Sequence, residues 1–271
     1  MLTPWPEGWP QHLLQNCFAD TPLAEWAANP HIERGNRKTQ EAVMKALLLG
    51  SIGVLAETSE LQRRAYNTAF VAHGIDWHWN IATYCRHLDT PGGQNRLRKL
   101  GGDALTTREI RRIHETKQDV FGASLAGGIA PRPGIVETLT AARAAGLRIG
   151  FVTTTTPRTI AMIREALSGH IDMSDFAVIT SKEDVVREKP DGACYELALS
   201  RLGIASHDAL AIEDTVASQS AAIEAGIRCH LYTGSYAIAG DAPLQTRDPA
   251  GALKADLAAR RHKAEGLAIA S

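Results

Sequence analysis

The chain has 271 residues, of which 44% are hydrophobic and 22% are charged, a usage typical of globular proteins that excludes a disordered or collagen-like chain. Its 29 lysines and arginines balance 30 aspartates and glutamates, so its charge gives no reason to expect a nucleic-acid partner or an anionic membrane. It has no apolar run near the roughly 18 residues of a membrane span, and no basic-then-apolar start typical of a signal peptide. The dispersed cysteines argue against a zinc site and a disulfide framework; they are Cys17, Cys85, Cys194 and Cys229. We therefore expect a soluble, cytoplasmic protein.

Residues 1–40 differ in composition from the rest of the chain, because they hold three of the five tryptophans and five of the 12 prolines. Prolines at this density break regular secondary structure. The segment is therefore predicted to be an irregular arm, with one or two helical turns near residues 23–28. Three hypotheses stay open for this arm: it packs on its own domain, it binds a partner protein through its tryptophans, or it is disordered.

From residue 43 onward, short apolar runs bounded by polar or glycine-containing turns alternate with helical patterns. Such runs are typical of buried parallel strands. The predicted strands are Met44–Leu49, Leu147–Thr153, Phe176–Thr180, Ala209–Ile212 and Arg228–Tyr232. Strands that alternate with helices predict an α/β fold, namely a Rossmann-like, doubly wound parallel sheet.

Capping residues predict where the helices of this sheet begin and end. Thr156 followed by Pro157 offers an N-cap and a proline at the first helical position. Gly146, Gly203 and Gly226 are suited to the residue that follows a helix. The predicted helices are Ile135–Ala145, residue 157 to about Leu167, Ala193–Leu202 and Val216–Ala225, with a further helix from about Asp248.

A long helical insertion separates the first predicted strand from the second. One helix is predicted over Glu60–His73, and Thr106 with Glu109 forms a capping box that opens a second helix through about Leu125. An all-helical insert at this point would lie over the carboxyl ends of the strands, where open α/β sheets bind ligands. The predicted domains are therefore a core of residues 41–58 and 131–245, a helical cap of residues 59–130, and a C-terminal helix or tail of residues 246–271.

Seven short motifs follow one another between residues 45 and 234. In the predicted core they are Leu47-Leu-Leu-Gly-Ser-Ile-Gly-Val-Leu-Ala-Glu-Thr58, Arg132-Pro-Gly-Ile135, Val152-Thr-Thr-Thr-Thr-Pro157, Glu188-Lys-Pro-Asp191 and Ala211-Ile-Glu-Asp-Thr215; in the predicted cap they are His73-Gly-Ile-Asp-Trp-His-Trp-Asn80 and Gly92-Gly93. Together they resemble the haloacid dehalogenase (HAD) superfamily, and within it the branch of CbbY-like phosphatases, which is associated with the removal of xylulose bisphosphate. The resemblance implies a Rossmann-like core with a helical cap, and hydrolysis of a phosphorylated sugar.

The first motif of this superfamily normally supplies two aspartates at the end of the first strand. The resemblance implies that the first aspartate attacks phosphorus and that the second, two residues later, protonates the leaving oxygen. The corresponding positions here are Gly50 and Ile52, whose side chains cannot perform this chemistry. Strand alternation is expected to turn the hydroxyl of Ser51 to the opposite face, so we do not expect Ser51 to replace the nucleophile.

The later motifs keep the residue types that the resemblance assigns to phosphate and metal binding. It implies that Thr153, Thr154 and Lys189 hold the phosphate, and that Glu213 and Asp214 hold Mg²⁺. Because position 50 contributes no carboxylate, we expect Mg²⁺ to bind weakly or not at all.

The predicted cap also departs from the family at positions that face the substrate. Gln62 stands where the family tends to have a histidine, and Gln94 stands where it tends to have a lysine. The cationic residues that remain available to bind an anion are Arg63, Arg64 and Arg96. The run Trp77-His78-Trp79 is expected to pack inside the cap, with an aromatic ligand cage as the alternative.

These departures favour a HAD-type protein that has lost phosphatase chemistry and binds a phosphorylated sugar or a partner protein. The alternative is a hydrolase that still acts on a sugar phosphate by an unrecognised route; the fold supports this alternative, whereas Gly50 and Ile52 oppose it. A third hypothesis is a scaffold that acts through the tryptophan-rich arm, which a pull-down with and without residues 1–40 would test.

Overall fold

The computed structural model describes residues 43–88, 90, 92–237 and 240–269. The arm of residues 1–40, its expected helical turns and Cys17 lie outside the described residues, so the hypotheses on the arm stay predictions. Residues 41–271 form one compact unit.

Five parallel strands form one sheet in the order β3-β2-β1-β4-β5. The strands are β1 (Ala46–Gly50), β2 (Arg148–Val152), β3 (Val178–Thr180), β4 (Ala209–Glu213) and β5 (Arg228–Leu231). The predicted doubly wound parallel sheet is therefore confirmed, although most of the strands are shorter than predicted. β1 begins two residues later than predicted and ends one residue later, at Gly50, which pairs with Val152 of β2. β4 lies on the other side of β1, so the ends of β1, β2 and β4 lie next to one another.

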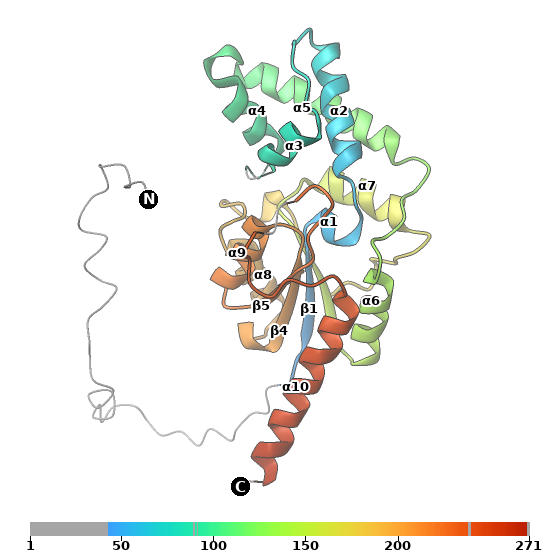
Figure 1. The fold of residues 1–271 in the computed structure, drawn as a ribbon, viewed down its shortest axis with the longest axis vertical. Coiled ribbons are helices and arrows are strands. Elements are labelled where there is room, and N and C mark those ends of the chain that lie inside the picture. Colours follow the sequence, from blue (N-terminus) through green and yellow to red (C-terminus); the bar gives the residue numbers. More distant parts are fainter. Residues whose placement is uncertain (1–42, 89, 91, 238–239, 270–271) are drawn as a thin grey trace, which may run out of the picture. The chain divides into compact units, whose positions relative to one another are not determined.

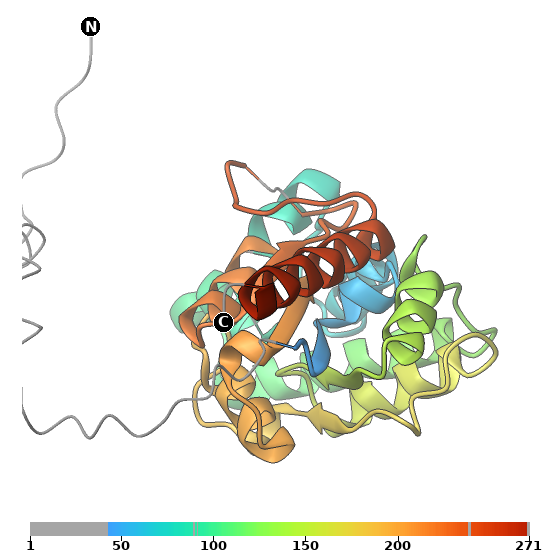
Figure 2. The same cartoon turned by 90° about the horizontal axis from the view of Figure 1, so that it is seen from below.

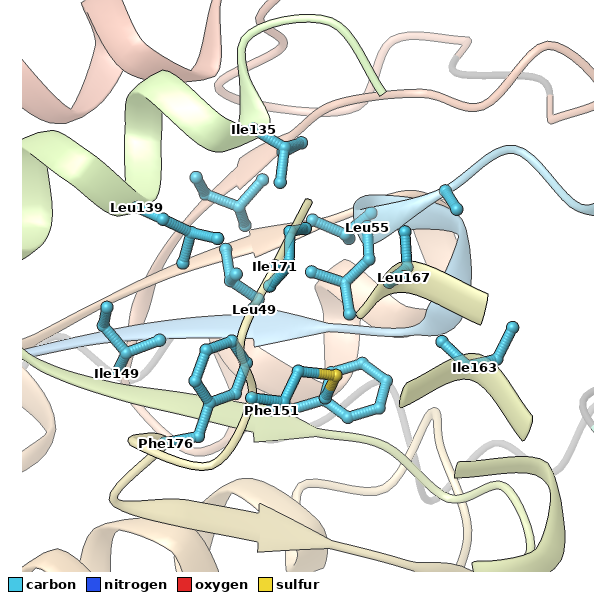
Figure 3. Close-up of a cluster of buried hydrophobic side chains, with 14 of the residues drawn as sticks. Leu49, Leu55, Ile135, Leu139, Ile149, Phe151, Ile163, Leu167, Ile171 and Phe176 are labelled. Atoms are coloured by element: carbon cyan, nitrogen blue, oxygen red, sulfur yellow. The ribbon is translucent and has the colours of Figure 1, made fainter. Parts of the chain in front are cut away.

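Helices cover both faces of this sheet. One face packs against α6 (Ile135–Ala144), α7 (Pro157–Leu167) and α10 (Pro249–Ile269), and the other against α8 (Ala193–Leu202) and α9 (Val216–Glu224). Successive side chains of β1 point to opposite faces of the sheet, so β1 contacts both helix layers. Leu47 and Leu49 pack on the side of α6, α7 and α10, and Ala46 and Leu48 pack on the side of α8 and α9. Figure 3 shows Leu49 and Phe151 from the sheet packed against Leu139 of α6 and Ile163 of α7.

The predicted caps define the helix ends. The Thr156 hydroxyl accepts a hydrogen bond from the Thr159 amide, and Pro157 opens α7. Gly203 ends α8 in the left-handed conformation, with φ of 61°. The expected C-terminal helix is α10, which contacts α6 (Figures 1 and 2).

Helices α2 (Ser59–Ala72), α3 (Ile81–His87), α4 (Gly93–Gly101) and α5 (Thr107–Ser124) form the insertion between β1 and β2. Figure 1 shows them gathered beyond the carboxyl ends of the strands. The predicted capping box is present at the start of α5, where the side chains of Thr106 and Glu109 each bond the other residue's backbone amide. Boundaries between a core domain and a cap domain at residues 58 and 130 stay a prediction.

An aromatic cluster holds the cap together. Trp79 is 2% exposed and packs against Tyr66 and Phe70, with ring centroids 4.6 and 4.9 Å apart. Trp77 meets Phe70 edge-on at 5.5 Å. Both tryptophans of the run Trp77-His78-Trp79 therefore pack inside the cap, as expected, and their rings contact other cap side chains instead of enclosing a ligand-sized cage.

The short helices of the described chain were not predicted from the sequence. These are α1 (Ile52–Leu55), α3 and α4, together with the 3₁₀ turns Gly102–Ala104, Lys182–Asp184 and Ser206–Asp208. None of the described helices is both long enough and apolar enough to cross a membrane.

Candidate functional site

A cavity of about 320 Å³ lies between the carboxyl ends of the strands and the cap. Its volume is within the range of small-molecule sites. Among its lining residues are Ile52, Thr153, Lys189 and Asp214 from the core, and Arg96 and Lys117 from the cap. The cavity thus brings together most of the residues that the resemblance assigns to phosphate binding.

The space beside Gly50 is filled by a neighbouring carboxylate. A Cβ atom placed on Gly50 would collide with all the atoms of the Glu213 carboxylate. Glu213 ends β4, next to β1, and it is fully buried. Glu213 therefore occupies the room that a side chain at position 50 would need, although it is not itself part of the cavity lining.

Two donors hold the Glu213 carboxylate in this place. The Lys189 ammonium lies 2.5 Å from Oε1 of Glu213, and it also donates to the Val152 carbonyl at 2.8 Å. The Tyr195 hydroxyl donates to the same Oε1 atom at 2.6 Å. Burial alone would lower the pKa of Lys189, but the Glu213 carboxylate outweighs burial and holds that pKa above its usual value. The positive charge that the resemblance assigns to the phosphate is thus already paired inside the protein.

Residues Ser51 and Ile52 line the cavity directly after Gly50. The strand ends at Gly50, so strand alternation does not determine which way the Ser51 hydroxyl points; the expectation that Ser51 does not replace the nucleophile stays a prediction. Its Oγ atom lies 3.2 Å from Oγ of Ser218, and no general base among the described residues is bonded to it. Ile52 offers no proton donor or acceptor at the position of the expected acid.

The threonine run after β2 forms a polar wall of the cavity. Thr153 to Thr156 all line it, and they lead into the N-terminus of α7. The Thr153 hydroxyl accepts from the Thr155 amide at 3.2 Å, and the Thr153 amide donates to the Thr180 hydroxyl at 3.0 Å. Thr154 is half-buried and faces the same cavity. Hydroxyls and a helix N-terminus at one place suit an anionic group.

The carboxylates expected to hold Mg²⁺, those of Glu213 and Asp214, offer a metal ion only part of its oxygen ligands. Oε2 of Glu213 and Oδ1 of Asp214 are buried without a hydrogen-bond partner, as oxygens that face a cation would be. However, Lys189 and Tyr195 take Oε1 of Glu213, and the described residues contain no group of three side chains suited to a metal. Mg²⁺ requires near-octahedral oxygen ligands. Burial and the nearby Glu213 carboxylate also raise the pKa of Asp214 to about 6.

The three cap arginines that were predicted to bind an anion lie in different environments. Arg96 lines the cavity, together with Gln62 and Gln94. Arg63 and Arg64 do not line it, because both pair with Glu60, at 2.7 and 2.6 Å. The structure therefore brings only Arg96 of the three to the candidate site.

Two residues in or beside the site, Lys117 and Tyr195, were not predicted from the sequence. Lys117 lies on the buried face of α5, at helical spacing from Ile113 and Phe121, and a lysine in such an apolar stripe was the available signal. Tyr195 occupies a similar position on the buried face of α8. Nothing in its spacing distinguishes a tyrosine that bonds a carboxylate from one that only packs.

We expect Gly50→Asp to lower stability by about 2–4 kcal/mol, because the new carboxylate displaces Glu213 and gathers three buried acids. Added Mg²⁺ should restore much of this loss, since the third carboxylate supplies a missing ligand. Gly50→Ala is the control, because it displaces Glu213 without adding charge. Thermal unfolding with Mg²⁺ and with a chelator measures both effects; an equal response of the two variants to Mg²⁺ would contradict the prediction.

The sheet order, the insertion after β1 and the cavity between them define a capped, Rossmann-like hydrolase fold. The chain belongs to the haloacid dehalogenase-like hydrolase family, which residues 27–226 match. Its similarity is to the CbbY-like branch of that family.

Curated relatives and solved structures support this placement. The chain is 38% identical to protein CbbY of Cereibacter sphaeroides over 199 residues, which are 72% of this chain and 86% of that protein. It is 34% identical to protein CbbY of Rhodobacter capsulatus, over 71% of this chain and 87% of that protein. A variant of CbbY from Rhodobacter sphaeroides in complex with xylulose-(1,5)bisphosphate superposes with a TM-score of 0.70 at 34% identity, covering 77% of this chain and 96% of that chain. The same protein in complex with phosphate gives 0.69.

Proposed function

We propose that this protein binds a small phosphorylated ligand of the sugar phosphate class and does not hydrolyse it. The observation that carries the proposal is the position of Glu213, whose carboxylate fills the space beside Gly50 and pairs with Lys189. A covalent phosphatase needs a nucleophile that reaches the phosphorus from this place. The side chain that lies there belongs to a buried, paired carboxylate outside the cavity lining.

Binding of a phosphate is supported by the polar wall of the cavity. Thr153 and Thr154 line it beside the N-terminus of α7, and neither needs a carboxylate at position 50 in order to meet an anion. The CbbY structures in complex with phosphate and with xylulose-(1,5)bisphosphate support a ligand of this class. Mg²⁺ is expected to contribute little to this binding, and we propose a cytoplasmic location.

Calorimetry tests the proposal, with inorganic phosphate and xylulose 1,5-bisphosphate as the probes and unphosphorylated xylulose as the comparison. Both phosphates should bind with Mg²⁺ and with a chelator. Thr154→Val should weaken phosphate binding roughly 10-fold, because it removes a hydrogen bond to a charged group without changing the shape of the side chain.

Thr140→Val is the matched control, because Thr140 is an exposed threonine on α6 that does not line the cavity. It should bind phosphate like the wild type. Absence of binding by the wild type in every condition would refute the proposed function. Release of inorganic phosphate from the bisphosphate at the rate of an active relative would support the alternative of a working hydrolase.

A further inference from the structure

Arg132, to which the proposed function gives no role, joins three segments of the chain that are distant in the sequence. Its guanidinium donates to the Gly53 carbonyl at 2.7 Å, and to the carbonyls of Tyr232 and Thr233 at 2.8 and 2.7 Å. Its backbone amide donates to the Leu55 carbonyl at 2.8 Å. Arg132 therefore connects the segment that leads into the cap, the segment that returns from it, and the loop that follows β5.

Residues 232–236, at the start of the loop that follows β5, are called the strap below. The strap begins on the core, next to the candidate site. The Tyr232 amide donates to the Glu213 carbonyl at 2.7 Å, and the Tyr232 hydroxyl donates to the Pro133 carbonyl at 3.0 Å. Cζ of Arg132 lies 3.5 Å from the centroid of the Tyr232 ring, a cation–π contact. The first residue of the strap is thus fixed at the carboxyl ends of the strands.

The strap then reaches the segment that leads into α2. The Ser235 amide donates to Oε2 of Glu57 at 2.6 Å, and the Ser59 amide donates to Oε1 of the same carboxylate at 3.0 Å. Burial alone would raise the pKa of Glu57, but hydrogen bonds from Ser59 and Ser235 outweigh burial and hold that pKa below its usual value. An ionised carboxylate at the start of the cap therefore binds the strap.

Tyr236 attaches the end of the strap to α2 itself. Its hydroxyl donates to Oε2 of Glu60 at 2.6 Å, and its ring meets that of Tyr84 edge-on, with centroids 6.2 Å apart. Glu60 also pairs with Arg63 at 2.7 Å, and the Arg63 guanidinium donates to the Trp79 carbonyl at 2.7 Å. Tyr236 is thereby linked to the aromatic cluster that holds the cap together.

The strap is a third connection between the core and the cap, in addition to the two chain segments that lead into the cap and back. Turning the cap away from the strand ends would separate Tyr236 from Glu60, because Tyr236 follows a strand of the core and Glu60 belongs to α2. Each hydrogen bond to an ionised carboxylate shifts such an equilibrium by about 10-fold or more. All of these contacts join two groups of the protein, so the strap needs no ligand in order to form.

We propose that residues 232–236 hold the cap over the cavity before a ligand binds, and that release of Tyr236 from Glu60 sets the rate at which a ligand enters and leaves. The cavity lies between the core and the cap, so a ligand passes when this contact opens. The effect on ligand rates rests on the proposed function, whereas the holding of the cap does not.

Hydrogen exchange measures the strap without any ligand. Tyr236→Phe removes only the hydroxyl that bonds Glu60, and it should speed exchange of the Ser235 amide roughly 10-fold, because the strap is released as a unit. Exchange of the amides of β1 should stay unchanged, which distinguishes release of the strap from global unfolding. Arg64→Met is the matched control: it removes another partner of Glu60, at 2.6 Å, but one that lies within the cap. It should leave the exchange of Ser235 at the wild-type rate.

A double variant tests whether Tyr236 acts through Glu60. Glu60→Ala removes the acceptor of the Tyr236 hydroxyl, so adding Tyr236→Phe to it should change the exchange of Ser235 by no more than about 2-fold. If the two substitutions instead act independently and their effects multiply, the hydrogen bond does not hold the strap, and the proposal is overturned.

Ligand kinetics test the second half of the proposal, with xylulose 1,5-bisphosphate as the probe. Phosphorus NMR line shapes measure its dissociation rate, and calorimetry measures its dissociation constant. Tyr236→Phe should raise both the association and the dissociation rate roughly 10-fold, because it destabilises the closed form equally with and without ligand. The dissociation constant should therefore stay within about 2-fold of the wild type. A residue that only stabilises the fold would not produce this separation of rate from affinity.

The remaining outcomes distinguish the two proposals. If Tyr236→Phe leaves the exchange of Ser235 unchanged, the strap does not hold the cap and the inference fails. If exchange is faster but the ligand rates keep their wild-type values, or only dissociation is faster, the strap does not control entry and exit. If the wild type does not bind the bisphosphate, the proposed function and the control of ligand rates fail together, while the exchange of Ser235 still decides whether the strap holds the cap.

Discussion

Purified protein should show no Mg²⁺-dependent phosphatase turnover above about one millionth of that of an active relative, because no carboxylate is placed to attack phosphorus. Gly50 has no side chain, and Glu213 is buried beside it in contact with Lys189 and Tyr195. Ile52 cannot protonate a leaving group, so we expect both steps of the family's chemistry to be absent. The measurement is phosphate release from a panel of sugar monophosphates and bisphosphates, with Mg²⁺ and with a chelator.

An active CbbY-like phosphatase assayed beside this protein sets the scale of the measurement. A residual acceleration on the order of 10³–10⁴-fold over the reaction in water is compatible with the absence of a nucleophile, because a site that only binds still orients its substrate. A phosphorylated residue trapped on this chain, or high turnover in several independent preparations, would refute the prediction.

Lys189→Met should lower the free energy of unfolding by about 3–5 kcal/mol, because it leaves the Glu213 carboxylate buried without its cation. Oε2 of Glu213 already lacks a hydrogen-bond partner, so only the Tyr195 hydroxyl would remain to compensate the charge. The double variant Lys189→Met/Glu213→Gln should recover at least about 2 kcal/mol, since the glutamine carries no charge and can still accept from Tyr195. Denaturant unfolding of the two variants and the wild type measures both steps.

Lys182→Met provides the comparison for this pair. Lys182 also forms an ion pair with a glutamate, Glu188, at 2.7 Å, but its side chain is 43% exposed. Loss of this ion pair should therefore lower the free energy of unfolding by no more than about 1 kcal/mol. If Lys189→Met lowered the free energy of unfolding no more than Lys182→Met does, the buried ion pair between Lys189 and Glu213 would not stabilise the fold. The same result would weaken the argument that Lys189 is already neutralised before a ligand arrives.

The core of the fold could be predicted because local signals and burial agree there. Leu47 and Leu49 alternate with Ala46 and Leu48, and both sets are buried between helices that end at predicted glycines such as Gly203. The short helices were missed for a physical reason. Helices such as α1, with four residues, form through tertiary contacts rather than through any repeated apolar spacing.

The candidate site was only partly predictable. The residues at strand ends, such as Thr153 and Asp214, could be placed because neighbouring parallel strands end at one edge of the sheet. Arg63 could not be excluded in advance, because its pairing with Glu60 depends on side-chain conformations within the cap. Nor could the sequence show that Glu213 turns toward Gly50, since that contact depends on the absence of a side chain in a neighbouring strand.

The position of the Glu213 carboxylate also bears on how phosphatase chemistry could be built into this chain. A single substitution that restores an aspartate at position 50 meets a neighbour already in its place, and it lowers stability before it contributes any activity. Ile52 would still block proton transfer, so that first step brings a cost without a gain in turnover. A single change to aspartate at position 50 is therefore expected to be selected against, and what this position tolerates depends on a residue 163 positions further along the chain.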